Sequence, residues 1–350
     1  MYSIASNSLI FNKSILKSLY CARCSVPSNF VLSALFKTSQ LKLGQSLRHP
    51  FQFSFYTHRK MASFTDNKIN TFQLVSDLHL EYYESEQIPN VLEFLTPSAE
   101  NLIIAGDLGN PKLSSYPDFL RQCSKLFKRV FVVAGNHEFY NLVSSAGDSK
   151  VCMVDVLQEI HKLMKEFTNV HFLDNSSFES DNYVILGATL WTRIASGEKR
   201  YIEIAMNDYR LIFTSVSGND ENISTKETTN ITKNLTVDDT NKLHDYSVKW
   251  LQQEIYKYKH KPVIIVTHHL ISNKLVSKKW LNHPINSGFR TELDDELLKN
   301  NEQVKYVCSG HTHSSLDTTS NNGVTRLLVN PRGYKGDLNV QFNKQMTFSI

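Results

Sequence analysis

The sequence has few cysteines, and they show no pattern of a disulfide framework. Its five cysteines, Cys21, Cys24, Cys123, Cys152 and Cys308, are odd in number and scattered over 350 residues. Disulfide-rich secreted domains carry even sets of closely spaced cysteines, so this distribution fits a reducing compartment. Cys21 and Cys24 have the spacing of half a zinc site, but no second pair of matching spacing lies nearby.

Long apolar runs and a strong net charge are also missing. No stretch reaches the roughly 18 apolar residues of a membrane-spanning helix, so we expect no membrane span. The formal net charge is only +4, and no stripe of basic and aromatic residues follows residue 65. Nucleic-acid-binding proteins carry such a stripe, so nucleic acid is not an expected partner. A hydrophobic content of 41% nevertheless provides for a sizeable core.

The first 65 residues lack acidic side chains altogether, and Asp66 is the first one in the chain. A basic, serine-rich leader without acidic residues is typical of a transit peptide, which predicts a mitochondrial location. The alternative is a disordered or unused leader in front of a start at Met61, which predicts a cytoplasmic one. A secretory signal is less favoured, because the apolar runs are short and come late.

Short apolar runs alternate with helical patterns after residue 70. The runs cover residues 72–76, 102–105, 130–134, 184–186, 263–266 and 304–307. Uninterrupted apolar runs of this length are typical of strands that are buried on both faces of a sheet. Apolar residues at spacings of three and four predict helices over 153–167 and 242–258. This alternation predicts an α/β domain over residues 70–350.

One polar segment interrupts the domain. Residues 214–241 are mostly serine, threonine, asparagine, aspartate, glutamate and lysine. Such a segment cannot bury enough apolar surface to offset the entropy of ordering it. We therefore predict a flexible surface insertion there.

Five of the apolar runs are followed directly by residues that can bind metals. These are Asp77-Leu78-His79, Gly106-Asp107, Gly135-Asn136-His137-Glu138, His268-His269 and Gly310-His311-Thr312-His313. Strands of an α/β sheet converge at their carboxyl ends, so these side chains should meet in space. A single Asp-x-His is a weak signal, but six of the 13 histidines follow such runs. The mixed nitrogen and oxygen set suits Mn, Fe, Zn, Co or Ni.

Taken in order, these motifs resemble those of the calcineurin-like metallophosphoesterase superfamily, from about residue 72 to the C-terminus. Residues 76–82, 206–210 and 330–334 further resemble a little-characterised branch of predicted phosphohydrolases. The resemblance implies a four-layer α/β/β/α sandwich with two central mixed sheets. It also implies a metal site at the carboxyl ends of the strands.

The resemblance further implies two metal ions, Mn, Fe or Zn, and a role for each motif residue. One metal would be held by Asp77, His79 and His313. The other would be held by Asn136, His268 and His311. Asp107 would bridge the two metals, and His137 would lie just outside them as a proton donor or transition-state stabiliser. His268 is preferred to His269 because it lies nearer the end of the strand, although the choice within this pair stays open.

Contacts to the substrate are less well marked by the sequence. Arg210 and Arg332 are candidates because guanidinium geometry matches phosphate oxygens, although each also reads as an ordinary surface arginine. His269 is a further candidate. Glu138 either orients His137 or a nearby ligand, or is a surface carboxylate.

The expected function is hydrolysis of a small phosphorylated substrate. Two cations about 3.5–4 Å apart would share a hydroxide that attacks phosphorus in line, assisted by His137. Monoesters, diesters, nucleotide anhydrides and phosphoproteins stay open as substrates, because metals recognise phosphate and not the leaving group. The alternatives are an inactive binding or scaffold module on this fold and a phosphodiesterase or nuclease acting on nucleotides. The sequence leaves the oligomeric state open.

Overall fold

The computed structural model describes residues 69–83, 90–141, 150–215 and 232–350. From Ile69 to Ile350 these residues belong to one compact unit. The leader predicted over 1–65 lies outside the described residues and stays a prediction. Among the described helices, none has the length and apolar character needed to cross a membrane.

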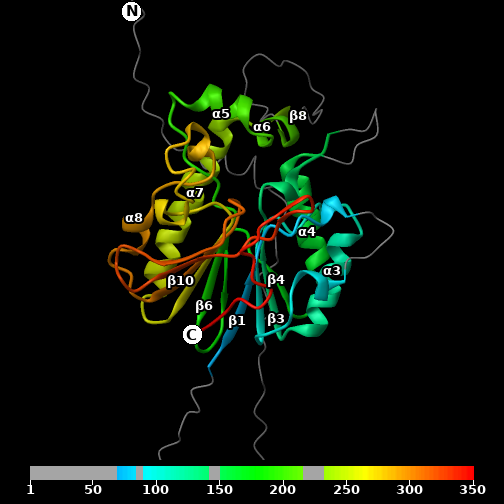
Figure 1. Cartoon of the computed structure of the whole chain (residues 1–350), viewed down its shortest axis with the longest axis vertical. Helices are drawn as coiled ribbons and strands as arrows, with labels where there is room; N and C mark the ends of the chain where they lie inside the picture. The colour runs from blue at the N-terminus through cyan, green and yellow to red at the C-terminus, as the bar shows by residue number, and fades with distance from the viewer. Residues whose placement is uncertain (1–68, 84–89, 142–149, 216–231) are drawn as a thin grey trace, which may run out of the picture. The chain divides into compact units, whose positions relative to one another are not determined.

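Two mixed sheets form the centre of the unit (Figure 1). The first has the order β15-β1-β2-β3-β4. Its strands are β1 (Thr71–Val75), β2 (Asn101–Ala105), β3 (Arg129–Val133), β4 (Val170–Phe172) and β15 (Thr347–Ser349). Neighbours from β1 to β4 are parallel, whereas β15 is antiparallel to β1. Three predicted strands, at 72–76, 102–105 and 130–134, therefore lie side by side in this sheet.

The second sheet has the order β11-β12-β10-β9-β6-β5. Its strands are β5 (Ser176–Glu179), β6 (Val184–Ala188), β9 (Val263–Thr267), β10 (Val304–Ser309), β11 (Leu316–Thr319) and β12 (Arg326–Val329). The four inner strands run parallel, and both edge strands are antiparallel to their neighbours. Two short ribbons complete the described strands: β7 (Phe213–Ser215) with β8 (Thr232–Asn234), and β13 (Gly333–Tyr334) with β14 (Asp337–Leu338).

The strands are buried on both faces because successive side chains enter different apolar clusters. In β2, Ile103 and Ala105 join a cluster shared with the second sheet, which includes Ile264 of β9. Leu102 and Ile104 point the other way, into a cluster with the helices. Burial on both faces explains why these strands appear in the amino-acid sequence as uninterrupted apolar runs.

Helices cover the outer faces of both sheets (Figure 1). Side chains from α2 (Val91–Phe94), α3 (Ser115–Leu126) and α4 (Met153–Met164) pack on the first sheet. Those from α7 (Val237–Lys257) and α8 (Asp294–Leu298) pack on the second. The predicted α/β fold with two central mixed sheets is confirmed, and the apolar clusters fit the predicted order of helices, sheet, sheet and helices.

The predicted insertion at 214–241 is ordered at both of its ends. β7 and β8 pair across it, and residues 216–231 between them lie outside the described residues. Helix α7 begins at Val237, five residues before the predicted start at 242. A capping box explains the earlier start, because the Thr236 side chain accepts from the Asp239 N–H and the Asp239 carboxylate accepts from the Thr236 N–H.

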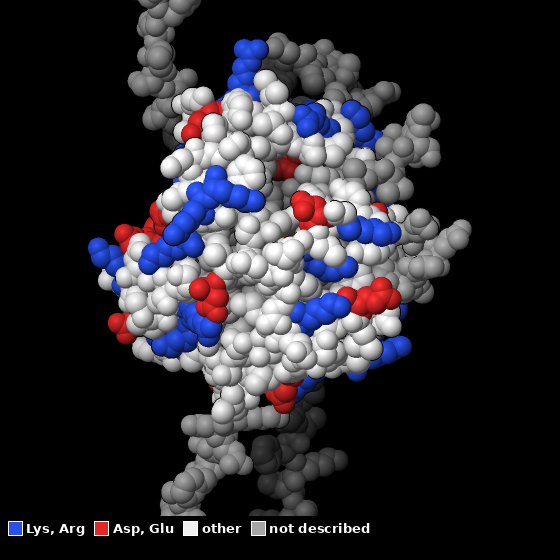
Figure 2. Space-filling view, viewed as in Figure 1, with Lys and Arg blue, Asp and Glu red and all other residues white. Residues whose placement is uncertain are grey.

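Charges are mixed on the face of the molecule shown in Figure 2. Lysine and arginine side chains there alternate with acidic ones and do not gather into a single basic patch. The cysteines within the described residues, Cys123, Cys152 and Cys308, are buried free thiols. The pair Cys21 and Cys24 lies outside the described residues.

Candidate metal centre

The structure brings all seven predicted metal ligands to one edge of the two sheets. Six of the seven, together with His137, offer ligand atoms that fall into groups whose members lie within 4.8 Å of one another, and Asn136 Oδ1 lies 3.1 Å from His268 Nε2. The groups are Asp77, His79 and His313; His79, Asp107 and His137; and Asp107, His268 and His311. Because Asp107 and His79 each belong to two groups, the groups form one continuous cluster.

The first group presents two ring nitrogens to each other. His79 Nε2 lies 3.0 Å from His313 Nε2, which lies 3.5 Å from Asp77 Oδ1. His79 Nδ1 donates to Glu81 Oε1 at 3.0 Å, so Nε2 is the ring nitrogen that faces the other predicted ligands. Two ring nitrogens and a carboxylate oxygen that face one point form a donor set that suits a bound cation.

The second group has the same character. His268 Nδ1 donates to the carbonyl of Ala105 at 3.0 Å, so Nε2 is the ring nitrogen that faces the other predicted ligands. That Nε2 lies 3.1 Å from Asn136 Oδ1 and 3.1 Å from His311 Nδ1. Although burial opposes charge, Asp107 raises the pKa of His268 to about 10, so the surroundings favour positive charge. These atoms therefore fit a cation chemically.

Asp107 lies between the two groups. Its Oδ2 is 3.4 Å from His268 Nε2 and 3.8 Å from His79 Nε2. Its Oδ1 accepts the backbone N–H of His137 at 2.9 Å. Burial alone would raise the pKa of Asp107, but His268 and His137 hold it well below its usual value. The structure thus places this carboxylate between the two predicted groups of ligands.

The loops that carry these residues are strained. Asp77, His79, Asp107, His311 and His313 all have positive φ, between 48° and 73°. Non-glycine residues in this region cost on the order of 1–3 kcal/mol each, and such residues collect at functional sites. Glycine is required at position 135, because a Cβ there would lie only 2.1 Å from Asp107 Oδ1.

Of the histidine pair, the structure brings His268 into the cluster and places His269 outside it. His269 Nδ1 donates to the carbonyl of Thr189 at 3.2 Å, and its ring lies against Trp191 and His311. Burial lowers the pKa of His269 to about 3, so this ring is neutral. His269 therefore packs against the His311 ring, outside the cluster of predicted ligands.

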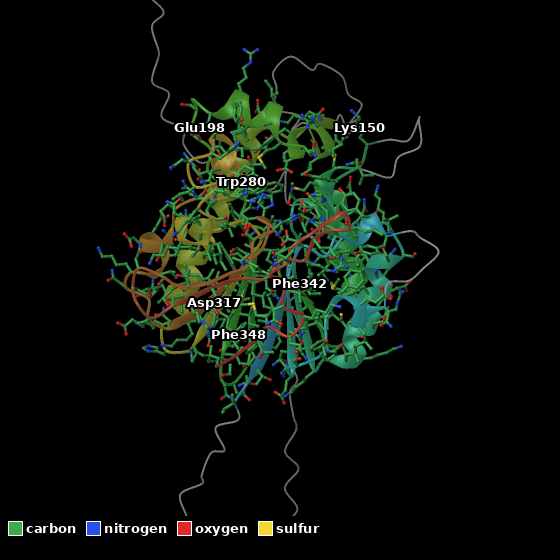
Figure 3. All side chains as sticks on the ribbon, viewed as in Figure 1. Lys150, Glu198, Trp280, Asp317, Phe342 and Phe348 are labelled. Carbon is green, nitrogen blue, oxygen red and sulfur yellow. The ribbon has the colours of Figure 1, made fainter. Side chains whose placement is uncertain are left out.

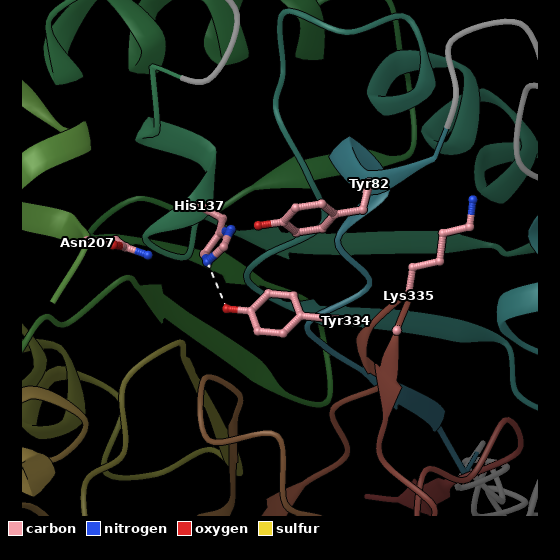
Figure 4. Close-up of a pocket in the computed structure, with 6 residues that line it drawn as sticks. Tyr82, His137, Asn207, Tyr334 and Lys335 are labelled. Carbon is pink, nitrogen blue, oxygen red and sulfur yellow. Dashed lines mark hydrogen bonds between the residues drawn. The ribbon is translucent and has the colours of Figure 1, made fainter.

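His137 is held through both of its ring nitrogens. Its Nδ1 donates to Glu81 Oε1 at 2.8 Å, and its Nε2 lies 3.3 Å from the Tyr334 hydroxyl (Figure 4). Burial opposes charge on His137, but Asp107 and Glu81 raise its pKa to about 9. The same Glu81 oxygen bonds His79, so one carboxylate positions both a ligand and the proposed proton donor.

Glu138 is buried and bonds the backbone. Its carboxylate accepts the N–H groups of Gly135 at 2.7 Å, Leu108 at 2.8 Å and Asp107 at 3.2 Å. It therefore ties the loop after β2 to the loop after β3. This supports the positioning of Asp107 more directly than that of the His137 ring.

Asp208 is a buried partner of the site that the sequence did not reveal. Its Oδ1 accepts from Asn136 Nδ2 at 2.8 Å and from the Tyr140 hydroxyl at 2.6 Å. This fixes the amide so that Asn136 Oδ1 faces His268. The usable signal was that Asp208 lies in the stretch 206–210, which resembles a branch of predicted phosphohydrolases and in which only Arg210 was given a candidate role.

Replacing Asp208 with alanine should weaken metal binding. Without the carboxylate the Asn136 amide can rotate, and loss of such a supporting contact lowers metal affinity by about 10–100-fold. Metal titration followed by calorimetry would measure this. Asp294→Ala is the matched control, because Asp294 is equally buried and bonds Ser272 and Asn321, away from the cluster. Equal affinities for both variants would contradict the role of Asp208.

The two predicted phosphate-binding arginines are engaged elsewhere. Arg210 is exposed and donates to the carbonyl of Ile204 at 2.6 Å and to Asn207 Oδ1 at 2.5 Å. Arg332 bonds the Tyr83 hydroxyl and lies 4.3 Å from the centre of the Phe94 ring. The structure does not bring either of them to the lining of the cavity beside the metal cluster.

That cavity has a volume of about 610 Å³. Asp107, Asn136, His137, His311 and His313 line its floor. Its size lies within the range of sites for small ligands. The cavity is therefore open to the predicted metal ligands and to His137 together.

Comparison with known proteins agrees with this geometry. The sequence model of the calcineurin-like phosphoesterase family matches residues 71–315. The chain therefore belongs to the calcineurin-like phosphoesterase family, whose members are metal-binding hydrolases.

Two individual relatives show how far the similarity extends. The chain is 29% identical over 278 residues to the uncharacterized protein L509 of Acanthamoeba polyphaga mimivirus, covering 76% of this chain and 91% of that protein. Its fold is similar to that of the phosphopantetheinyl hydrolase PptH from Mycobacterium tuberculosis, with a TM-score of 0.56 and 15% identity. That match covers 81% of this chain and 96% of the other, and shows a shared fold alone.

Proposed function

We propose that this protein hydrolyses phosphate esters with two bound metal ions. The observation that carries the proposal is the position of Asp107 Oδ2, between His268 Nε2 at 3.4 Å and His79 Nε2 at 3.8 Å. A carboxylate oxygen shared by two groups of electron-pair donors is what a dinuclear site requires. Family membership supports the same class of activity.

The donor set indicates which residues hold the metals and which metals fit. Asp77, His79 and His313 would hold one ion, and Asn136, His268 and His311 the other. Mixed histidine, carboxylate and amide ligands suit Mn, Fe or Zn. When bound, two such ions supply Lewis acidity and a water that is acidic enough to ionise near neutral pH.

His137 would serve the leaving group. Because its Nδ1 donates to Glu81, its Nε2 is directed toward the Tyr334 hydroxyl and the cavity. From there Nε2 can hydrogen-bond a phosphoryl oxygen or give its proton to the leaving oxygen. Glu81 holds the ring in this orientation and stabilises the protonated form.

Removing the metals should abolish activity reversibly. We expect the full chain to hydrolyse p-nitrophenyl phosphate or bis(p-nitrophenyl) phosphate with Mn²⁺, to lose this activity after EDTA and dialysis, and to regain it with added metal. Metal content measured alongside should approach two ions per chain. A chain that holds two ions and hydrolyses neither ester would instead indicate an inactive binding module.

A further inference from the structure

His137 and Tyr334 lie between two hollows of similar size. One, of about 640 Å³, is lined by Tyr82, His137, Asn207, Tyr334, Lys335 and Gly336 (Figure 4). The other is the 610 Å³ cavity over the metal cluster, and it shares His137, Asn207 and Tyr334 with the first. A phosphorus atom in front of His137 therefore has room for a substituent on either side. We call the first the tyrosine hollow, after Tyr82 and Tyr334, and the second the tryptophan hollow, because its lining includes Trp280.

The tryptophan hollow has an aromatic wall that starts at the metal cluster. The Phe289 ring lies 4.7 Å from the His311 ring. Trp280, labelled in Figure 3, is 43% exposed, and the His283 ring lies 5.0 Å from it at 78°. Lys279 Nζ lies 5.3 Å from the Trp280 ring centre. An exposed indole in a cavity wall offers a flat face on which a ring of the substrate can stack.

Two tyrosine rings are the aromatic side chains, apart from His137, among the six residues that line the tyrosine hollow. Tyr82 and Tyr334 lie 5.5 Å apart at 87°, and Tyr82 is 45% exposed. The Tyr334 ring also lies 4.4 Å from the ring of His79, so this hollow begins directly at the predicted metal ligands. Lys335 also lines this hollow, and its Nζ extends to 5.0 Å from the centre of the Tyr83 ring. This hollow can therefore hold a second substituent on the same phosphorus.

The charges in both hollows favour a phosphate with a single negative charge. Among the described residues lining them, lysines 279 and 335 are the cationic side chains apart from histidine, and no arginine is present. Asp208 and Asp337 add negative charge to the tryptophan hollow. A monoester dianion is commonly met by forked arginine contacts, whereas a diester carries only one charge.

Building on the proposed function, we propose that the substrate is a phosphodiester. A flat ring of one substituent lies along Phe289 and Trp280, and the other substituent lies across Tyr82 and Tyr334. Water forms the new oxygen–phosphorus bond, and the bond between phosphorus and one ester oxygen breaks. That oxygen leaves with a proton from His137, and the proton of the water restores His137. The products are an alcohol and a phosphomonoester.

The first test compares two esters on the full chain with Mn²⁺ bound. We expect kcat/KM for bis(p-nitrophenyl) phosphate to exceed that for p-nitrophenyl phosphate by about tenfold or more, the scale that one pocket contact can reach. Preference for the monoester would overturn the diester proposal and leave the metal-dependent phosphoesterase standing. Hydrolysis of neither ester by the metal-loaded chain would overturn both.

The second test probes the two hollows separately. Trp280→Ala and Tyr82→Ala should each raise KM for the diester several-fold, and Tyr82→Ala should lower kcat/KM for the diester more than for the monoester. Tyr256→Ala is the control, because Tyr256 is an exposed aromatic residue on α7 that lines neither hollow. Metal content and melting temperature check that each variant is folded and loaded. Unchanged diester KM values in Trp280→Ala and Tyr82→Ala would overturn the proposal.

Discussion

Replacing Asp107 with asparagine is expected to lower kcat by about a thousandfold or more and to deplete metal at both positions, because two-metal catalysis depends on its shared ligand. The Asp107 Oδ2 atom lies within 4 Å of ring nitrogens from both donor groups. An amide would remove its negative charge, which faces two cations. It would also leave only one oxygen where the carboxylate has two.

The measurement is metal content by elemental analysis together with kcat on both p-nitrophenyl esters. Asparagine can keep the bond from the His137 N–H to Oδ1, so the fold should survive the change. Asp294→Asn provides the control, since Asp294 is also buried and accepts the backbone N–H of Asn321. A variant at Asp107 that retains two ions and wild-type turnover would contradict the bridging assignment.

The ligand set could be predicted because its signal is local in the sequence. Asp77, Asp107 and Asn136 each follow an apolar strand by one to three residues, and the parallel strands β1, β2 and β3 are neighbours in one sheet. Parallel strands bring their carboxyl ends to the same edge. The position of such a residue in the chain therefore fixes its approximate place in the site.

Partners that come from short elements outside the central sheets carry no such signal. Asp208 is 72 residues from Asn136 in the chain, and Tyr334 is 197 residues from His137. Asp208 opens a short helix and Tyr334 lies on the short ribbon strand β13, so their contacts depend on how these small elements pack beside the central sheets. Glu81 lies two residues after His79 but on a short 3₁₀ turn, η1 (Leu80–Tyr82), whose direction no periodicity reveals.

The two arginines were predicted from the sequence as phosphate contacts, but the structure gives them other partners. Arg210 and Arg332 lie in stretches that resemble the family, and guanidinium groups suit phosphate, yet both bond other parts of this chain. Residue type indicates what a side chain can bind, whereas packing decides what it reaches. For Arg332 the packing places it over Phe94, on the helix-covered side of the first sheet.

Exchange of His137 for alanine tests whether the cluster is a catalyst or only a metal site. We expect kcat to fall by about 10²–10⁴-fold, the usual contribution of a general acid. Metal content should stay near two ions, because the predicted ligands remain. His244→Ala is the control, since His244 is a buried histidine that bonds the carbonyl of Trp191 away from the cluster.

Glu81→Gln separates the orientation of His137 from its chemistry. In the wild-type chain a single oxygen, Glu81 Oε1, accepts hydrogen bonds from both His79 and His137. A glutamine Oε1 carries no charge and can still accept from one of the two histidines. We therefore expect a smaller fall in kcat than for His137→Ala, joined by weaker metal binding through His79. If His137→Ala instead lost metal while Glu81→Gln retained it, His137 would be a ligand, as its place in a group with His79 and Asp107 allows.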